Sequence, residues 1–178
     1  MLSLGVSVGF IFKVLLCSGL TIDDFRTFYK PKENTELVNI QALIEQSISF
    51  VQNAIDKKDI VVVNELEHIE YKLYQNEFIQ VMLNLIKNAI DAIDNNGIIV
   101  VKLYKEDTKV IVSVQNDGVC ISGEDMMKIF EPYYTTKKES MGLGLYMAKI
   151  IIQTHMKGSI VVGENDNQTI FRIELPLV

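Results

Sequence analysis

A predicted helix with an amide-lined seam is the feature that most limits how this chain can fold. Residues 75–94 carry apolar side chains around most of the helix surface, yet asparagine, a mediocre helix former, occurs at both Asn84 and Asn88. Helical spacing places three further polar side chains on the same stripe, with Lys87 beside it. The stripe consists of Gln80, Asn84, Asn88, Asp91 and Asn95. Such a helix packs into a core along its flanks, while its seam faces either solvent or a polar ligand.

The order of the predicted elements favours an α+β fold. In sequence they are a strand at 37–40, a helix at 40–55, a strand at 59–65, the helix at 75–94, strands at 98–105 and 109–115, a helix at 143–155, and strands at 159–164 and 169–177. Residues 116–141 contain no long apolar run and are predicted to form a structured loop. Helices combined with mostly hairpin-linked strands predict a two-layer sandwich, in which helices cover one face of a mixed, mostly antiparallel sheet.

Composition excludes several classes of protein. The formal net charge is −6 and the sequence has no basic cluster, which argues against a nucleic-acid-binding surface. Cys17 and Cys120 are too few and too far apart for a disulfide framework or a zinc site, and we expect reduced thiols in a cytoplasmic protein. Neither an HExxH metalloprotease motif nor a GxSxG nucleophile elbow occurs.

The first twenty residues are apolar and leave two alternatives open. Lys13 lies inside the apolar run rather than before it, which is not the pattern of a secretory signal. The length and the Gly5–Gly9 pair would suit a membrane span, whereas three glycines and three serines favour the remnant of a helical packing segment. Pro31 ends the amphipathic stretch 21–31. We therefore expect a helical remnant over 1–30 and one domain over 31–178.

Four motifs follow one another along the chain. They are NLIKNAIDA (84–92), NDGVCI (116–121), FEPYYTTK (130–137) and MGLGL (141–145). In this order and spacing they resemble the N, G1, F and G2 boxes of the histidine-kinase catalytic domain, a member of the GHKL ATPase superfamily together with gyrase and the mismatch-repair ATPases. The resemblance covers residues 31–178 and implies the α+β fold of that family, with ATP and Mg²⁺ as ligands.

The amide seam suits Mg-ATP on chemical grounds. Mg²⁺ prefers oxygen ligands and keeps several waters, so that one or two protein ligands suffice. An asparagine carbonyl provides an oxygen without adding negative charge beside a triphosphate. The resemblance implies that Asn88 is the Mg²⁺ ligand, that Asn84 lines the same seam and that Lys87 approaches a phosphate.

The glycines of the G2 box are predicted to hold phosphate. Gly142 and Gly144 open a helix whose first amides can approach phosphate oxygens, although GLGL alone is also typical of a plain turn. Lys137 and Lys138 are expected to reach the γ-phosphate from the lid between G1 and G2, while Phe130, Pro132, Tyr133 and Tyr134 pack the lid. The ATP site implied by the resemblance comprises Asn84, Lys87, Asn88, Asp91, Asn116, Gly118, Ile121, Phe130, Lys137, Lys138, Gly142, Leu143, Gly144, Leu145 and Thr169.

The G1 box departs from the family pattern Asp-x-Gly-x-Gly. Asn116 stands in place of the Asp that accepts a hydrogen bond from the adenine amino group, and Cys120 replaces the second glycine, while Gly118 is retained. The Asn116 carbonyl can still accept such a bond. Thr169 is expected to assist through water.

The phosphoacceptor histidine of the family is absent. Residues 18–31 resemble the end of the helical hairpin that precedes this domain in sensor kinases, but the residues before them contain no histidine. We expect structural roles for His68 and His155. The resemblance therefore implies a kinase that phosphorylates a histidine on a separate dimerisation helix, and the chain alone is not expected to phosphorylate itself.

The resemblance also implies partners. They are an acceptor-helix domain and a response regulator, with a homodimer in the full-length kinase, and a membrane is involved only through the N-terminal or missing segments. Two alternatives are a non-catalytic ATP-binding regulatory module and a slow ATPase. A gyrase-type ATPase would supply a glutamate base near the N box, where this chain has Asn84.

Overall fold

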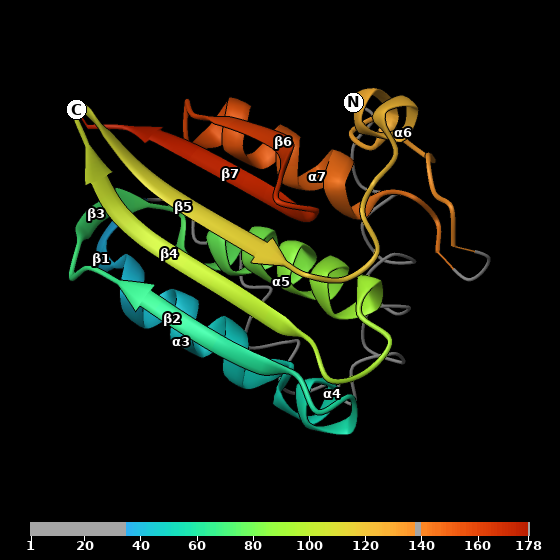
Figure 1. Cartoon of the computed structure of the whole chain (residues 1–178). Helices are drawn as coiled ribbons and strands as arrows, with labels where there is room; N and C mark the ends of the chain where they lie inside the picture. Colours follow the sequence, from blue (N-terminus) through green and yellow to red (C-terminus); the bar gives the residue numbers. More distant parts are fainter. Residues whose placement is uncertain (1–34, 138–139, 178) are drawn as a thin grey trace. The chain divides into compact units, whose positions relative to one another are not determined.

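The structure is a computed structural model that describes residues 35–137 and 140–177. A five-stranded mixed sheet forms one of its two layers (Figure 1). The strand order is β2-β4-β5-β7-β6, with β2 parallel to β4 and the other pairs antiparallel. The strands are β2 (Val61–Leu66), β4 (Ile98–Glu106), β5 (Lys109–Asn116), β6 (Ser159–Asn165) and β7 (Gln168–Pro176). The predicted mixed, mostly antiparallel sheet is confirmed.

Helices α3 (Ile40–Phe50), α5 (Gln75–Ala92) and α7 (Gly144–Ile150) form the second layer, on one face of this sheet (Figure 1). α5 contacts both α3 and α7, and α7 continues as the π-helix η1 (Ile151–His155). Strand residues alternate between the two faces, so that every second side chain points at the helices. On β7 the buried set is Thr169, Phe171, Ile173 and Leu175. The core therefore lies between the sheet and α5.

Smaller elements complete the described part of the chain. β1 (Glu36–Asn39) and β3 (Glu70–Leu73) form a separate antiparallel pair. α4 (Gln52–Lys57) follows α3, and α6 (Gly123–Lys128) lies between β5 and α7.

The structure corrects four details of the predicted elements. The helix expected at 40–55 is divided at Val51, whose ψ of 9° is not helical. β3 was not predicted: its residues alternate polar and apolar, but Glu70 and Lys72 are residue types depleted in strands. α6 lies inside the expected loop 116–141 and begins where the Ser122 hydroxyl accepts a hydrogen bond from the Asp125 amide at 3.1 Å. α5 ends at Ala92 rather than residue 94, because Ile93 is extended; Asn95 therefore leaves the predicted stripe.

A two-residue turn fixes the register at the far end of the sheet. Asp166 and Asn167 join β6 to β7 with φ of 49° and 60°, the conformation of a tight hairpin turn. The neighbouring pair β5–β7 then places Thr169 directly opposite Asn116.

The N-terminal predictions fall outside the described residues. Both the helical remnant expected at 1–30 and the alternative membrane span concern residues before 35. Within the described part, no helix combines the length and the apolar character that crossing a bilayer requires.

Candidate nucleotide-binding site

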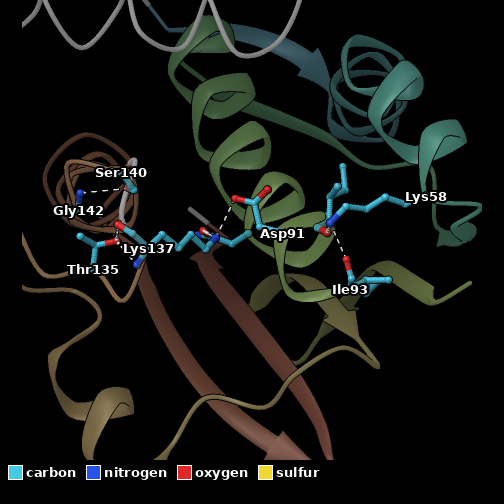
Figure 2. A network of polar contacts seen from close by, with 9 residues as sticks. Lys58, Asp91, Ile93, Thr135, Lys137, Ser140 and Gly142 are labelled. Carbon is cyan, nitrogen blue, oxygen red and sulfur yellow. Dashed lines mark hydrogen bonds and ion pairs between the residues drawn. The ribbon is translucent and has the colours of Figure 1, made fainter. Parts of the chain in front are cut away.

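The seam of α5 faces the F and G2 boxes. The Asn84 side-chain nitrogen donates to the Gly144 carbonyl at 3.1 Å. Figure 2 shows the second contact, in which Lys137 Nζ lies 2.8 Å from Asp91 Oδ2. Lys137 Nζ also lies 3.4 Å from Asn88 Oδ1. Three of the four boxes therefore converge on one helix face, and the seam is not merely a solvated stripe.

The ends of β5 and β7 carry two buried polar groups without partners. Asn116 and Thr169 are each 2% exposed and lie opposite one another in the sheet. Among the described residues, Asn116 Nδ2 and Thr169 Oγ1 are the buried side-chain nitrogen and oxygen atoms that lack a hydrogen-bond partner. Leaving such a group unpaired costs about 1–3 kcal/mol, which favours a partner such as an ordered water or a bound ligand. A nucleobase edge, with its own donors and acceptors, can serve as such a ligand.

The G1 loop lies directly on the end of α5. The Val119 amide donates to the Ala92 carbonyl at 2.8 Å, and a Cβ at position 118 would overlap the Ala92 backbone, so that only glycine fits there. The Asp117 carboxylate accepts a hydrogen bond from the Ile98 amide at 2.7 Å. An open depression of about 210 Å³ is lined by residues 92–97 and 117–119. Asp117 is thus used to hold the loop against β4.

The rest of the G1 loop reaches the β6–β7 turn. Cys120 is a free cysteine, and its Sγ lies 2.9 Å from the Asn167 carbonyl oxygen. Ile121, which follows it, is half-buried.

The G2 box depends on one left-handed glycine. Gly142 has φ of +66°, and a Cβ there would overlap the backbone of Tyr133 and Tyr134. Its amide donates to the Ser140 hydroxyl at 3.3 Å (Figure 2). Gly144 begins α7, where a Cβ would come within 3.2 Å of the Asn84 side-chain oxygen. Leu143 is buried, and Leu145 and Lys87 are half-buried; Lys138 lies outside the described residues.

Comparison with known proteins identifies the family. Residues 74–178 match the family described as Histidine kinase-, DNA gyrase B-, and HSP90-like ATPase. The chain belongs to this ATPase family. The resemblance carried by the four boxes is thereby confirmed, and nucleotide binding is the family's common property.

Relatives within the family include sensor kinases. The heme sensor protein HssS of Staphylococcus aureus is 33% identical over 141 residues, which are 78% of this chain and 31% of HssS. The chain thus spans about a third of the length of the curated relatives it matches. The catalytic domain of histidine kinase ThkA superimposes with a TM-score of 0.75 at 33% identity, covering 80% of this chain and 95% of that domain. ThkA in complex with its response regulator TrrA gives a TM-score of 0.72 at 27% identity, covering 99% of this chain and 53% of that chain.

The F box of this ATPase domain is only partly packed. Phe130 is half-buried, with its ring edge-on to Phe171 at 6.4 Å and Lys149 Nζ 5.6 Å from its centroid. Pro132 and Tyr133 are exposed, Tyr133 by 71%, so the expectation that they pack the lid is wrong.

A hydrogen bond joins the F box to α6. The Tyr134 hydroxyl donates to the Asp125 carboxylate. This bond lowers the pKa of Asp125 and raises the pKa of Tyr134. It therefore favours the ionised carboxylate and the protonated phenol.

Both histidines of the domain have local partners. His68 Nδ1 lies 3.1 Å from Asn39 Nδ2. His155 Nδ1 lies 2.7 Å from Glu77 Oε2, and its ring is edge-on to Tyr74. These contacts suit the structural roles expected of them.

Sequence reasoning missed the lysine that holds the end of α5. Lys58 Nζ donates to the carbonyls of Ile90 at 2.7 Å and Ile93 at 2.5 Å (Figure 2). The last carbonyls of a helix lack intrahelical partners and carry partial negative charge, so an ammonium group satisfies both. Lys58 precedes the helix end by more than thirty residues, so no local sequence pattern predicts this contact.

Lys58→Met should lower the free energy of unfolding by about 1–3 kcal/mol, because the Ile93 carbonyl loses the Lys58 donor and the Ile90 carbonyl keeps only its 3.3 Å bond from the Ile93 amide. Urea denaturation measures this change. Lys57→Met, at an exposed neighbouring lysine, serves as the control and should change stability by less than about 0.5 kcal/mol. Equal effects of the two substitutions would contradict the role given to Lys58.

Proposed function

We propose that this chain is the ATP-binding catalytic domain of a sensor histidine kinase, which transfers the γ-phosphoryl group of ATP to a histidine on a separate dimerisation helix. The observation that carries the nucleotide part is the pair of unpartnered buried atoms, Asn116 Nδ2 and Thr169 Oγ1. The kinase part is supported by the match with nearly the whole ThkA catalytic domain at 33% identity.

The proposal gives each part of the site a task. Asn116 holds the base, with Thr169 beside it. Asn84, Lys87, Lys137 and Lys138 serve the phosphates, and Asn88 ligates Mg²⁺, which when bound offsets phosphate charge. The backbone at Gly118, Gly142 and Gly144 allows the nucleotide to approach closely. Apolar surface for contact with the nucleotide comes from Ile121, Phe130, Leu143 and Leu145.

Asn84 favours transfer to a protein over hydrolysis of ATP. A hydrolase needs a base to activate water, and a side-chain amide has no basic site at neutral pH. In addition, the Asn84 nitrogen already donates to the Gly144 carbonyl. Positioning of an acceptor in line with the γ-phosphate would then supply the catalysis.

The local contacts of His68 with Asn39 and of His155 with Glu77 support an acceptor histidine on another chain or segment. We propose two partners, an acceptor-helix domain and a response regulator. The full-length kinase would be a homodimer whose catalytic domain lies in the cytoplasm, and any membrane anchor would lie in other segments. The complex of ThkA with TrrA supports a response regulator as partner.

The isolated chain with Mg-ATP should not label itself, but it should phosphorylate a supplied acceptor-helix domain of a related kinase. Acid-labile radioactive label on each protein is the measurement. Release of phosphate without label on the acceptor would instead support a slow ATPase. Label on this chain that is lost in His68→Ala or His155→Ala would refute the proposal.

Asn88→Ala should weaken Mg-ATP binding by about 1–3 kcal/mol or more, because a metal ligand is lost while the helix is retained. Titration calorimetry measures the affinity, and Asn53→Ala on the exposed side of α4 is the matched control. Unchanged affinity in Asn88→Ala would remove Asn88 from the metal site.

Asn116→Asp should strengthen ATP binding and sharpen its preference over GTP. An ionised carboxylate only accepts hydrogen bonds, so it pairs with the adenine amino group and repels the guanine carbonyl, whereas an amide can turn and offer a donor. The expected gain in discrimination is about 1–3 kcal/mol. Competition binding of the two nucleotides tests this, with Asn165→Asp at an exposed strand end as control. An unchanged ATP/GTP ratio would show that Asn116 does not contact the base.

A further inference from the structure

We propose that Asn88 and Asp91 together form a cation site, and that the Lys137 ammonium group occupies this site until a divalent metal displaces it. The proposal deepens the function given above, because it concerns the metal of the same site. It adds Asp91 as a metal ligand and makes Lys137 a competitor of the metal.

The geometry is that of a cation held by two oxygens. Asn88 and Asp91 are three residues apart on α5, so their side chains lie on one face of the helix. Lys137 Nζ lies 2.8 Å from the Asp91 carboxylate and 3.4 Å from the Asn88 carbonyl oxygen (Figure 2). A carboxylate and an amide oxygen side by side are ligands that Mg²⁺ and Mn²⁺ also accept.

Charge explains why this pair needs a cation. The Asp91 carboxylate lies beside the residue proposed to face the metal and the phosphates, where an uncompensated negative charge would repel a triphosphate. Either Lys137 or a divalent ion can neutralise the carboxylate. The two cations therefore exclude each other at Asp91, and metal binding releases Lys137 for another contact.

The exposure of the pair makes such an exchange feasible. The side chains of Lys137 and Asp91 are 42% and 37% exposed. An ion pair this open to solvent is weak and is screened by salt, unlike a buried pair. A divalent ion therefore has to overcome only a small competing interaction.

The test measures Mn²⁺ binding to the whole chain without nucleotide, by electron paramagnetic resonance of the free ion. Removing the competitor in Lys137→Gln should tighten Mn²⁺ binding roughly two- to fivefold, the range that the loss of an exposed ion pair allows. Lys128→Gln removes the same charge from the exposed end of α6 and should not reproduce this gain.

Asp91→Asn decides whether the gain belongs to the proposed site. In this background Mn²⁺ binding should weaken, and adding Lys137→Gln should give no gain. The proposal is overturned if Lys137→Gln binds Mn²⁺ no more tightly than the unmodified chain, if Lys128→Gln gains equally, or if the gain persists in Asp91→Asn. Because neither nucleotide nor acceptor helix is present, failure of the kinase assay and failure of this test are separate outcomes.

Discussion

The last turn of α5 is the point on which the other parts of the site depend. Carbonyls at this helix end accept hydrogen bonds from two directions: Lys58 reaches Ile90 and the capping residue Ile93, and the Val119 amide reaches Ala92. The first contact connects the helix to the turn before β2, and the second connects it to the G1 loop. A helix end that would otherwise expose partial negative charge thus fixes the distance between the seam and the sheet end that carries Asn116 and Thr169.

The polar side chains of the seam lie along one face of α5, and only one of those that face the F and G2 boxes is charged. Asn84 and Asn88 contribute neutral oxygens, and Asp91 contributes the carboxylate that Lys137 neutralises. At the other end of the site the polar side chains are uncharged and almost fully enclosed, as Asn116 and Thr169 show. The two ends therefore suit the two halves of a nucleotide, one ionic and one aromatic.

The parts of the fold that sequence predicted are those governed by local periodicity. The helical spacing around Asn84 and Asn88 and the alternation on β7 follow from backbone geometry alone, and both are present. The boundary at Ala92 could not be predicted, because the chain leaves the helix where Lys58 and Val119 take over its carbonyls. For the same reason Asn95 was assigned to the seam incorrectly. α6 was missed because it is too short to show a helical period, and β3 because Glu70 and Lys72 are residue types depleted in strands. The Asp91–Lys137 pair was missed because its members are 46 residues apart.

The parallel pairing of β2 with β4 ties the sheet edge to the helix that carries the seam. Antiparallel neighbours can be joined by a tight turn, but parallel ones need a crossover, and here the connection between β2 and β4 contains β3 and all of α5. Closing so long a connection costs chain entropy, which the docking of α5 must offset. Undocking of α5 would therefore remove packing that offsets the cost of pairing β2 with β4. The rate at which β2 amide hydrogens exchange with solvent would then report on how firmly α5, the helix proposed to face the metal, is held.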